Sequence, residues 1–225
     1  MYQHALTATR TQRNVLIVMV STTKGLCGGL NVNLHRTYAN FVQSNLQDAK
    51  ISVVTIGRKI RWVLPNREVT LVARFDSIGE TPTFEETRAV ARYAMDTFLN
   101  GSYDAVYLAY PKFISTLASE PQLSQLLPVT ADQTTKTSQL NSYLIEPNPQ
   151  SLIDTLLPYQ VEMFTHQALL ESRASEHSAR MVAMKNASDN AHDLIGNLTL
   201  DYNSARQTQV TSELLDVTTA RMALE

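Results

Sequence analysis

The stretch MKNASDNAHDLIGNLTLDYNSA, residues 184–205, decides how the fold of this sequence is interpreted. Apolar residues recur in it at steps of three and four, which is the spacing of one face of an α-helix. We call this set the apolar stripe, and it consists of Met184, Ala187, Ala191, Leu194, Ile195, Leu198, Tyr202 and Ala205. Because the stripe is narrow, it predicts the seam of a coiled coil, packed against a second helix. Gly196 costs the helix about 1 kcal/mol relative to alanine, which close approach of that second helix could offset.

Helix-compatible sequence continues in both directions from this stretch. It runs from Pro158, a residue suited to the first turn of a helix, to Ala223. A helix of roughly 65 residues is close to 100 Å long, at ~1.5 Å per residue. A globular domain of roughly 140 residues is only ~40 Å across. We therefore expect more than half of the helix to extend beyond a globular body. The alternative, that the stripe packs on the protein's own domain, stays open for the part near Pro158.

The pattern changes after Ala205. A polar band follows, made of Arg206, Gln207, Thr208, Gln209, Thr211 and Ser212. The later apolar residues, from Val210 to Leu224, scatter around the helix instead of lining one side. This end of the helix is therefore predicted to be surrounded by other protein on several sides.

The first two thirds of the chain alternate between predicted strands and helices. The run Val15–Ser21 is apolar and β-branched, which is typical of a strand buried on both faces of a sheet. Further strands are predicted at Ile51–Ile56, Val69–Phe75, Tyr103–Tyr110 and, as a short fifth, Ser142–Glu146. Helices are predicted at about 31–47, 58–64 and 85–99, the last capped by Thr83 and stopped by Gly101. The predicted fold class is a doubly wound α/β domain at 15–150, after a short segment at 1–14 and before a long helix at 151–225.

Composition excludes several classes of protein. The 225 residues carry a net charge of −2 and a pI near 6.2, which disfavours a strongly basic nucleic-acid binder. Cys27 is the single cysteine, so neither an intramolecular disulfide nor a four-cysteine zinc site can form. No stretch approaches the ~20 apolar residues that cross a bilayer. We therefore expect any membrane association to pass through a partner.

No catalytic, cofactor or metal site is predicted. The loop KGLCGGLN, Lys24–Asn31, could hold a phosphate on backbone N–H groups, but it matches neither of the glycine-rich nucleotide motifs. A tight turn between strand and helix is the favoured interpretation, and a small nucleotide-binding α/β protein remains an alternative. His166, His177 and His192 lie ~16 Å or more apart along one helix, so they cannot share a metal.

Three stretches resemble the signature segments of the ATP synthase gamma subunit. They are STTKGLCGGLNVN at 21–33, EHSARMVAMKNASDN at 176–190 and LTLDYNSARQTQVTSELLDV at 198–217. The resemblance implies a Rossmann-like α/β domain followed by a long C-terminal helix that forms half of an antiparallel coiled coil. It also implies a non-catalytic central-stalk subunit of a proton-translocating rotary ATP synthase. Such a subunit couples rotation of the membrane ring to conformational changes in the catalytic subunits.

The resemblance also assigns contact residues and partners. Contacts with the catalytic subunits are implied for Arg180, Arg206, Gln207, Thr211, Glu213 and Asp216, and contacts with the membrane ring for Tyr143 and Glu146. The implied partners are the alpha, beta and epsilon subunits and the membrane c-ring, on the cytoplasmic face of a bacterial inner membrane. A solvated helix face remains the alternative for Arg206 and Gln207, and an ordinary strand end the alternative for Tyr143 and Glu146.

The sequence departs from the family pattern at its start. Family members carry a long helix ahead of the first strand, and that helix is the partner of the C-terminal one. Only residues 1–14 precede Val15 here, and they are too few to form it. We therefore expect this sequence to lack that helix.

Two functions remain as alternatives to the central-stalk subunit. The first is the small nucleotide-binding α/β protein described above, and the second is a generic coiled-coil adaptor.

Overall fold

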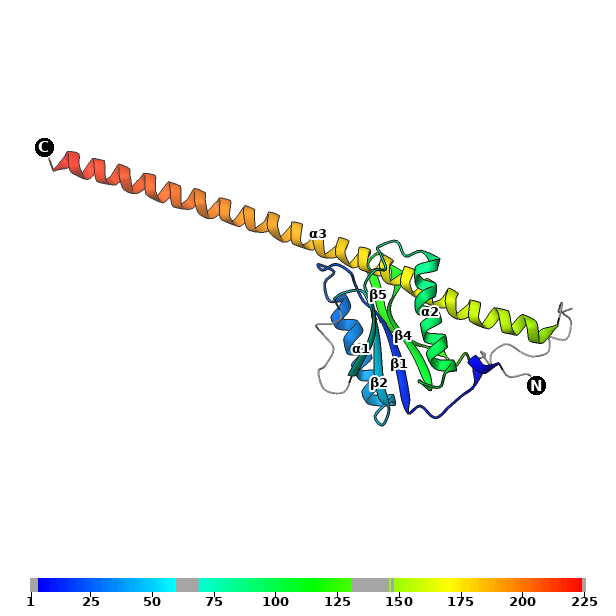
Figure 1. Cartoon of the computed structure of the whole chain (residues 1–225). Coiled ribbons are helices and arrows are strands. Elements are labelled where there is room, and N and C mark those ends of the chain that lie inside the picture. The colour runs from blue at the N-terminus through cyan, green and yellow to red at the C-terminus, as the bar shows by residue number, and fades with distance from the viewer. Residues whose placement is uncertain (1–3, 60–68, 131–145, 147, 224–225) are drawn as a thin grey trace, which may run out of the picture. The chain divides into compact units, whose positions relative to one another are not determined.

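The computed structural model describes residues 4–59, 69–130, 146 and 148–223 (Figure 1). The chain divides into two units, residues 1–180 and 181–225. The strands are β1 (Asn14–Val20), β2 (Lys50–Ile56), β3 (Val69–Phe75), β4 (Ala105–Ser115) and β5 (Ala118–Leu127). The helices are α1 (Leu30–Asn45), α2 (Phe84–Leu99) and α3 (Pro149–Met222), and a short 3₁₀ turn spans Ala5–Thr7.

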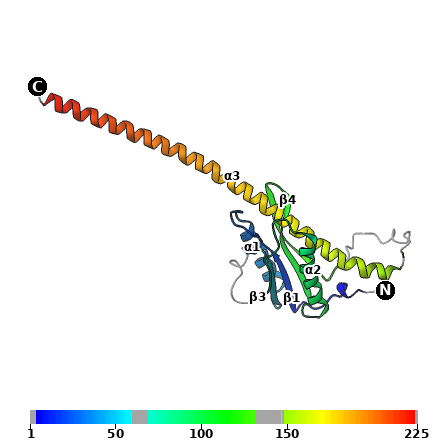
Figure 2. The ribbon, with the colours of Figure 1, turned by 45° about the horizontal axis from the view of Figure 1, so that its top comes forward.

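The strands form one mixed sheet in the order β3-β2-β1-β4-β5. The pairs β3–β2, β2–β1 and β1–β4 are parallel, whereas β4 and β5 form an antiparallel hairpin. Helix α1 covers one face of the sheet, and α2 covers the other together with the first part of α3 (Figures 1 and 2). The predicted α/β fold with a long C-terminal helix is confirmed.

Strand β1 lies at the centre of the sheet, and its side chains alternate between the two faces. Val15, Ile17 and Met19 pack with α1 on one face. Leu16 and Val18, on the opposite face, pack with α2 and α3. Helices cover both faces, which explains why this strand is a continuous apolar run rather than an alternating one.

Helix α2 begins as its sequence predicts. The Thr83 side chain accepts a hydrogen bond from the Glu86 N–H, and the Glu86 carboxylate accepts one from the Thr83 N–H. This reciprocal pair is a capping box. At the other end, Gly101 has φ of 74°, a conformation that glycine adopts without steric cost.

Strand β5 was not predicted from the sequence. Most of its side chains are only partly buried, and Pro121 lies within it. The strand therefore lacks the apolar run that identifies β1. Proline is tolerated here because β5 is at the edge of the sheet, where one side of the strand needs no ladder hydrogen bonds.

The predicted start of the long helix at Pro158 is wrong. Helix α3 begins at Pro149, and Pro158 lies inside it. The Asn148 side chain accepts a hydrogen bond from the Ser151 N–H at 2.8 Å and so caps the first turn. The preference of proline for a first turn therefore applies to Pro149. Residues 60–64 of the predicted short helix, and 142–145 of the predicted fifth strand, lie outside the described residues.

The chain segments that leave the neighbouring parallel strands β1 and β2 come very close together at Gly57. Its φ is 89°, and a Cβ atom there would lie 2.4 Å from the Ser21 carbonyl oxygen. The Ser21 N–H and hydroxyl both donate to the Ile56 carbonyl, at 2.8 and 3.0 Å, so this backbone cannot easily retreat.

We expect Gly57→Ala to lower the free energy of unfolding of the first unit by about 3 kcal/mol, combining left-handed strain with overpacking. Urea unfolding followed by circular dichroism measures this. The control is Gly79→Ala, because a Cβ at Gly79 meets no atom within 4 Å. Equal stability of the two variants would show that the Ser21 contact is not restrictive.

Candidate functional site

The apolar stripe lies entirely in the second unit, where helix α3 exposes nearly every side chain. The large side chains of the stripe, from Met184 to Tyr202, are between 43% and 67% exposed. Helical periodicity places them on one face, since each residue advances the helix by ~100°. Within the part of the chain that the structure describes, nothing buries this face. A helix of this kind gains most of its stability from packing, so the stripe is a candidate docking surface for another helix.

The polar band follows the stripe along the same helix. The predicted contact residues are all exposed: Arg206, Gln207 and Thr211 lie within the band, and Glu213 and Asp216 lie just beyond it. Their helical positions point in different directions around the axis, because Arg206 and Thr211 are five residues apart. Thr211 donates to the Gln207 carbonyl at 2.8 Å, and Glu213 accepts from Gln209 at 3.0 Å. The Arg206 guanidinium is exposed and could bind an acidic group of a partner.

Arg180 differs from the other predicted contact residues, because its side chain is partly buried in the first unit. Its Nη2 lies 2.6 Å from Glu176 Oε1, and its Nε donates to the Gly25 carbonyl at 3.3 Å. It therefore ties helix α3 to the loop between β1 and α1, residues 21–29, which we call the β1–α1 loop. Of the two residues predicted at the membrane ring, Glu146 is exposed and Tyr143 lies outside the described residues.

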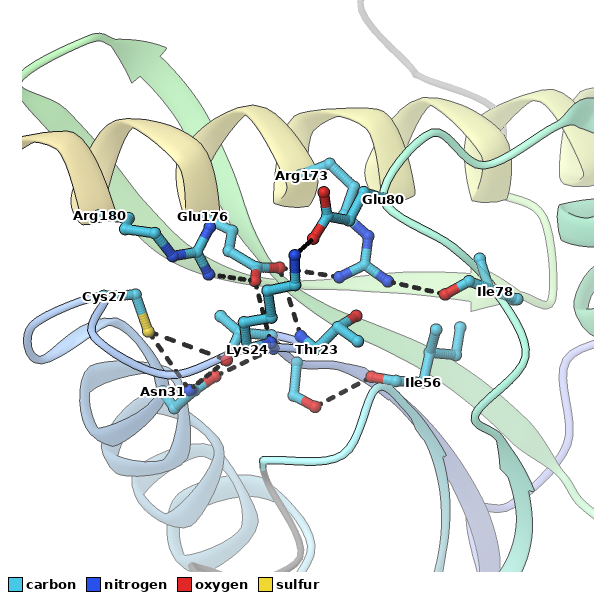
Figure 3. Close-up of polar contacts among 12 residues, drawn as sticks. Thr23, Lys24, Cys27, Asn31, Ile56, Ile78, Glu80, Arg173, Glu176 and Arg180 are labelled. Atoms are coloured by element: carbon cyan, nitrogen blue, oxygen red, sulfur yellow. Dashed lines mark hydrogen bonds and ion pairs between the residues drawn. The ribbon is translucent and has the colours of Figure 1, made fainter.

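Sequence reasoning missed Glu176, although it is the centre of the polar cluster in Figure 3. Its carboxylate is 2% exposed and accepts from Arg173 at 2.8 Å as well as from Arg180. It also accepts from the backbone N–H groups of Thr23 at 3.4 Å and Lys24 at 3.2 Å. The signal in the sequence is an acidic residue with arginines three before and four after it, which by itself looks like a solvated ion pair.

These contacts weaken the alternative of a phosphate site in the β1–α1 loop. A phosphate would need free backbone N–H groups there. The Thr22 N–H donates to the Asn31 side chain, and those of Thr23 and Lys24 donate to Glu176. The Lys24 ammonium group pairs with Glu80. Side-chain oxygens of Asn31 and Glu176 therefore already accept from three of the backbone N–H groups of this loop.

The pKa of the Glu176 carboxyl is set by two opposing effects. Burial raises this pKa, whereas the hydrogen bonds from Arg180, the Lys24 N–H and Arg173 lower it. The hydrogen bonds prevail, and the pKa lies below its ordinary value of 4.5. Glu176 is therefore charged at neutral pH and neutralises part of the positive charge of the two arginines.

Among the described residues, no three His, Cys, Asp or Glu side chains are placed to hold a metal ion. Within the same ranges, no helix combines the length and the apolar character needed to cross a bilayer.

Comparison with known proteins gives one consistent result. A family model described as "ATP synthase" matches residues 1–224. The ATP synthase gamma chain of Dehalococcoides mccartyi (strain ATCC BAA-2100) is 40% identical over 221 residues, covering 98% of this chain and 76% of the relative. That of Azoarcus sp. (strain BH72) is 41% identical over 219 residues, with 96% and 76% covered.

Solved structures have the same fold. One is the central stalk and c-ring of the Tetrahymena thermophila mitochondrial ATP synthase, with TM-score 0.61 and 23% identity over 80% of this chain and 79% of that one. Another comes from the Euglena gracilis mitochondrial ATP synthase, with TM-score 0.66 and 17% identity over 98% and 78%.

The lowered pKa of Glu176 predicts a specific loss of stability in acid. A carboxyl with a depressed pKa stabilises the fold above its ordinary value of 4.5, and this contribution is lost as the pH falls through the depressed pKa. We expect the stability difference between wild type and Glu176→Gln to be largest at neutral pH and to shrink below pH 4.5. Urea unfolding at several pH values measures it, and a difference independent of pH would contradict the assignment.

Proposed function

This chain belongs to the ATP synthase gamma-chain family, and on that premise we propose that it is the non-catalytic central-stalk subunit of a rotary ATP synthase. In this role it couples rotation of the membrane ring to conformational changes in the catalytic subunits, during ATP synthesis or hydrolysis. The observation that carries the proposal is the exposed apolar stripe on α3, followed along the same helix by the exposed polar band. One part can dock on a second helix, while the other contacts surrounding subunits.

The proposed division of labour follows the two kinds of surface. The α/β domain, residues 15–150, serves as the foot, and the helix at 151–225 serves as half of an antiparallel coiled coil. The foot meets the epsilon subunit and the c-ring, with Tyr143 and Glu146 at the ring. The protein thus associates with the cytoplasmic face of a bacterial inner membrane through its partners. Neither a cofactor nor nucleic acid takes part.

The proposed contacts with the alpha and beta subunits rest on charge and exposure. Arg206 and Gln207 offer hydrogen-bond donors, and Glu213 and Asp216 offer acceptors, all on exposed turns of α3. Charge-assisted hydrogen bonds of this kind are roughly twice as strong as neutral ones. Because the side chains radiate around the helix, different rotational positions bring different ones to the same partner loop. The chemistry of ATP formation belongs to the partner subunits.

The stripe predicts a sharp positional effect on assembly. We expect Leu198→Glu to weaken co-purification with the alpha and beta subunits at least tenfold, because a charge in a packed seam costs more than the ~1.4 kcal/mol that this factor represents. The matched control is Leu200→Glu, which puts the same charge two residues away on the opposite side of the helix and should assemble nearly normally. A pull-down of the tagged chain against the alpha–beta assembly measures both.

The same pull-down separates the alternatives. Self-association without any binding to the alpha–beta assembly would replace the proposal with a coiled-coil adaptor. Binding of ATP by the purified chain at millimolar concentration would support the nucleotide-binding protein. Equal assembly of the Leu198 and Leu200 variants would show that the stripe is not a seam.

The polar band predicts a defect in coupling rather than in assembly. We expect the double variant Arg206→Ala and Gln207→Ala to assemble normally but to lower ATP-driven rotation or proton pumping several-fold, since each lost contact to a charged group is worth ~1.5–3 kcal/mol. Lys185→Ala removes an exposed charge on the same helix outside the band and serves as the control. Activity of the double variant equal to that of the control would remove these two residues from the contact set.

A further inference from the structure

The face of α3 that is buried in the first unit is mostly polar. Besides Val161, Ala168 and Leu169, the buried residues are Glu162, Thr165, Ser172, Arg173, Ser175 and Glu176. Several of these polar groups bond to other elements: Ser175 donates to the Pro111 carbonyl at 3.1 Å, and Arg88 donates to Glu162 at 3.0 Å. An apolar surface tolerates sliding, whereas hydrogen bonds demand one arrangement. The polar groups therefore specify how the helix is seated on the domain.

Glu176 is the most heavily used of these groups. Its Oε2 accepts from Arg173 and from the Thr23 N–H, and its Oε1 accepts from Arg180 and from the Lys24 N–H. Two of the four donors come from α3 itself and two from the β1–α1 loop. One carboxylate thus joins segments about 150 residues apart in the sequence.

The loop that it holds carries local strain. Leu26 has φ of 63°, in the left-handed region, and its side chain is 73% exposed. For a bulky residue this conformation is strained and persists only where neighbouring contacts enforce it. The Leu26 side chain is too exposed to anchor the loop. The enforcing contacts are those to the backbone of the three residues before it, Thr23, Lys24 and Gly25.

We propose that Glu176 is a positioning residue, whose buried carboxylate holds the β1–α1 loop and the Arg180 guanidinium against α3 in a single arrangement. Removing its charge releases the loop and leaves the sheet intact. The inference goes beyond the proposed function, because it concerns the chain itself and not its assembly. Glu176 also sets the orientation of Arg180, a predicted contact residue, and it can do so without touching any partner subunit itself.

The four hydrogen-bond donors around Glu176 determine what a glutamine in its place would do. A glutamine at 176 offers one carbonyl oxygen, and its amide NH₂ would face an N–H or guanidinium donor on the other side. Arg173 is itself buried, so losing the carboxylate leaves a buried charge without its partner. Arg173 Nη2 keeps only a 3.4 Å bond to the Ile78 carbonyl. Movement of the strained β1–α1 loop is the easiest way to bring a new partner or water to the unpaired Arg173 charge.

The chain contains a native reporter of such movement. Cys27 is its single cysteine, lies in the β1–α1 loop and is 4% exposed. Its sulfur contacts the Thr22 hydroxyl and the Asn31 amide at 3.8 Å each. A thiol reagent can reach this sulfur only when the loop opens or the whole domain unfolds.

The experiment measures the rate at which the purified full chain reacts with Ellman's reagent under native conditions. We expect Glu176→Gln to react at least tenfold faster than wild type. Glu176→Asp keeps the charge on a shorter side chain and should react at an intermediate rate. A rate in Glu176→Gln equal to that of wild type would overturn the proposal.

Glu162→Gln is the matched control. Glu162 is also a buried carboxylate on α3 bonded by two arginines, Arg88 and Arg92, but none of its hydrogen bonds reaches the β1–α1 loop. The thiol reagent can reach Cys27 through local opening of the loop or through unfolding of the whole domain, and a urea series separates these two routes. The reaction rate rises weakly with urea when the loop opens locally and steeply when the domain unfolds. We expect only the Glu176 variant to gain a reaction that is insensitive to urea. Equal gains in both variants, following global stability, would show that Glu176 is an ordinary stabilising residue.

Discussion

A helix in water is stable only where its apolar face is covered, and the rest of this structure depends on that constraint. In the first unit the sheet covers α3, through Val161, Ala168 and Leu169 on the side shared with α2. In the second unit the apolar stripe remains open to solvent. The two halves of one helix therefore have different requirements: the first is satisfied within the chain, and the second calls for another helix. This requirement for a second helix fits the proposed role as a central-stalk subunit, in which α3 forms half of a coiled coil.

The α/β domain contributes more than an apolar support. Its contacts with α3 also include two carboxylates of that helix, with Glu162 bonded to α2 and Glu176 bonded to the β1–α1 loop. Buried ion pairs add little net stability, because desolvation offsets most of their attraction. Their value lies in specificity, since they accept only one rotational setting of the helix. A subunit that must transmit torque benefits from such a joint more than from additional apolar packing.

The sequence predicted those features whose signals are local. The run of β1 and the cap of α2 at Thr83 depend on neighbouring residues, and both are confirmed. Strand β5 escaped prediction because its half-exposed residues show no clear alternation of apolar and polar side chains. It forms a strand through its antiparallel pairing with β4, which the local sequence does not reveal. The candidate site divides in the same way. The apolar stripe is periodic and was visible, whereas the role of Glu176 requires knowing that residues 23 and 176 meet in space.

The order of strands in the sheet has a consequence for how the chain forms during synthesis. Strand β1 is synthesised before the other four strands of the sheet, yet β4, one of its two neighbours, follows some 90 residues later. Until then one side of this very apolar strand lacks a hydrogen-bonded partner. Non-local parallel pairing is slow, so the nascent segment has a period in which it can adhere to other chains. A chaperone that holds the nascent segment between β1 and β4 would supply the protection that this topology requires.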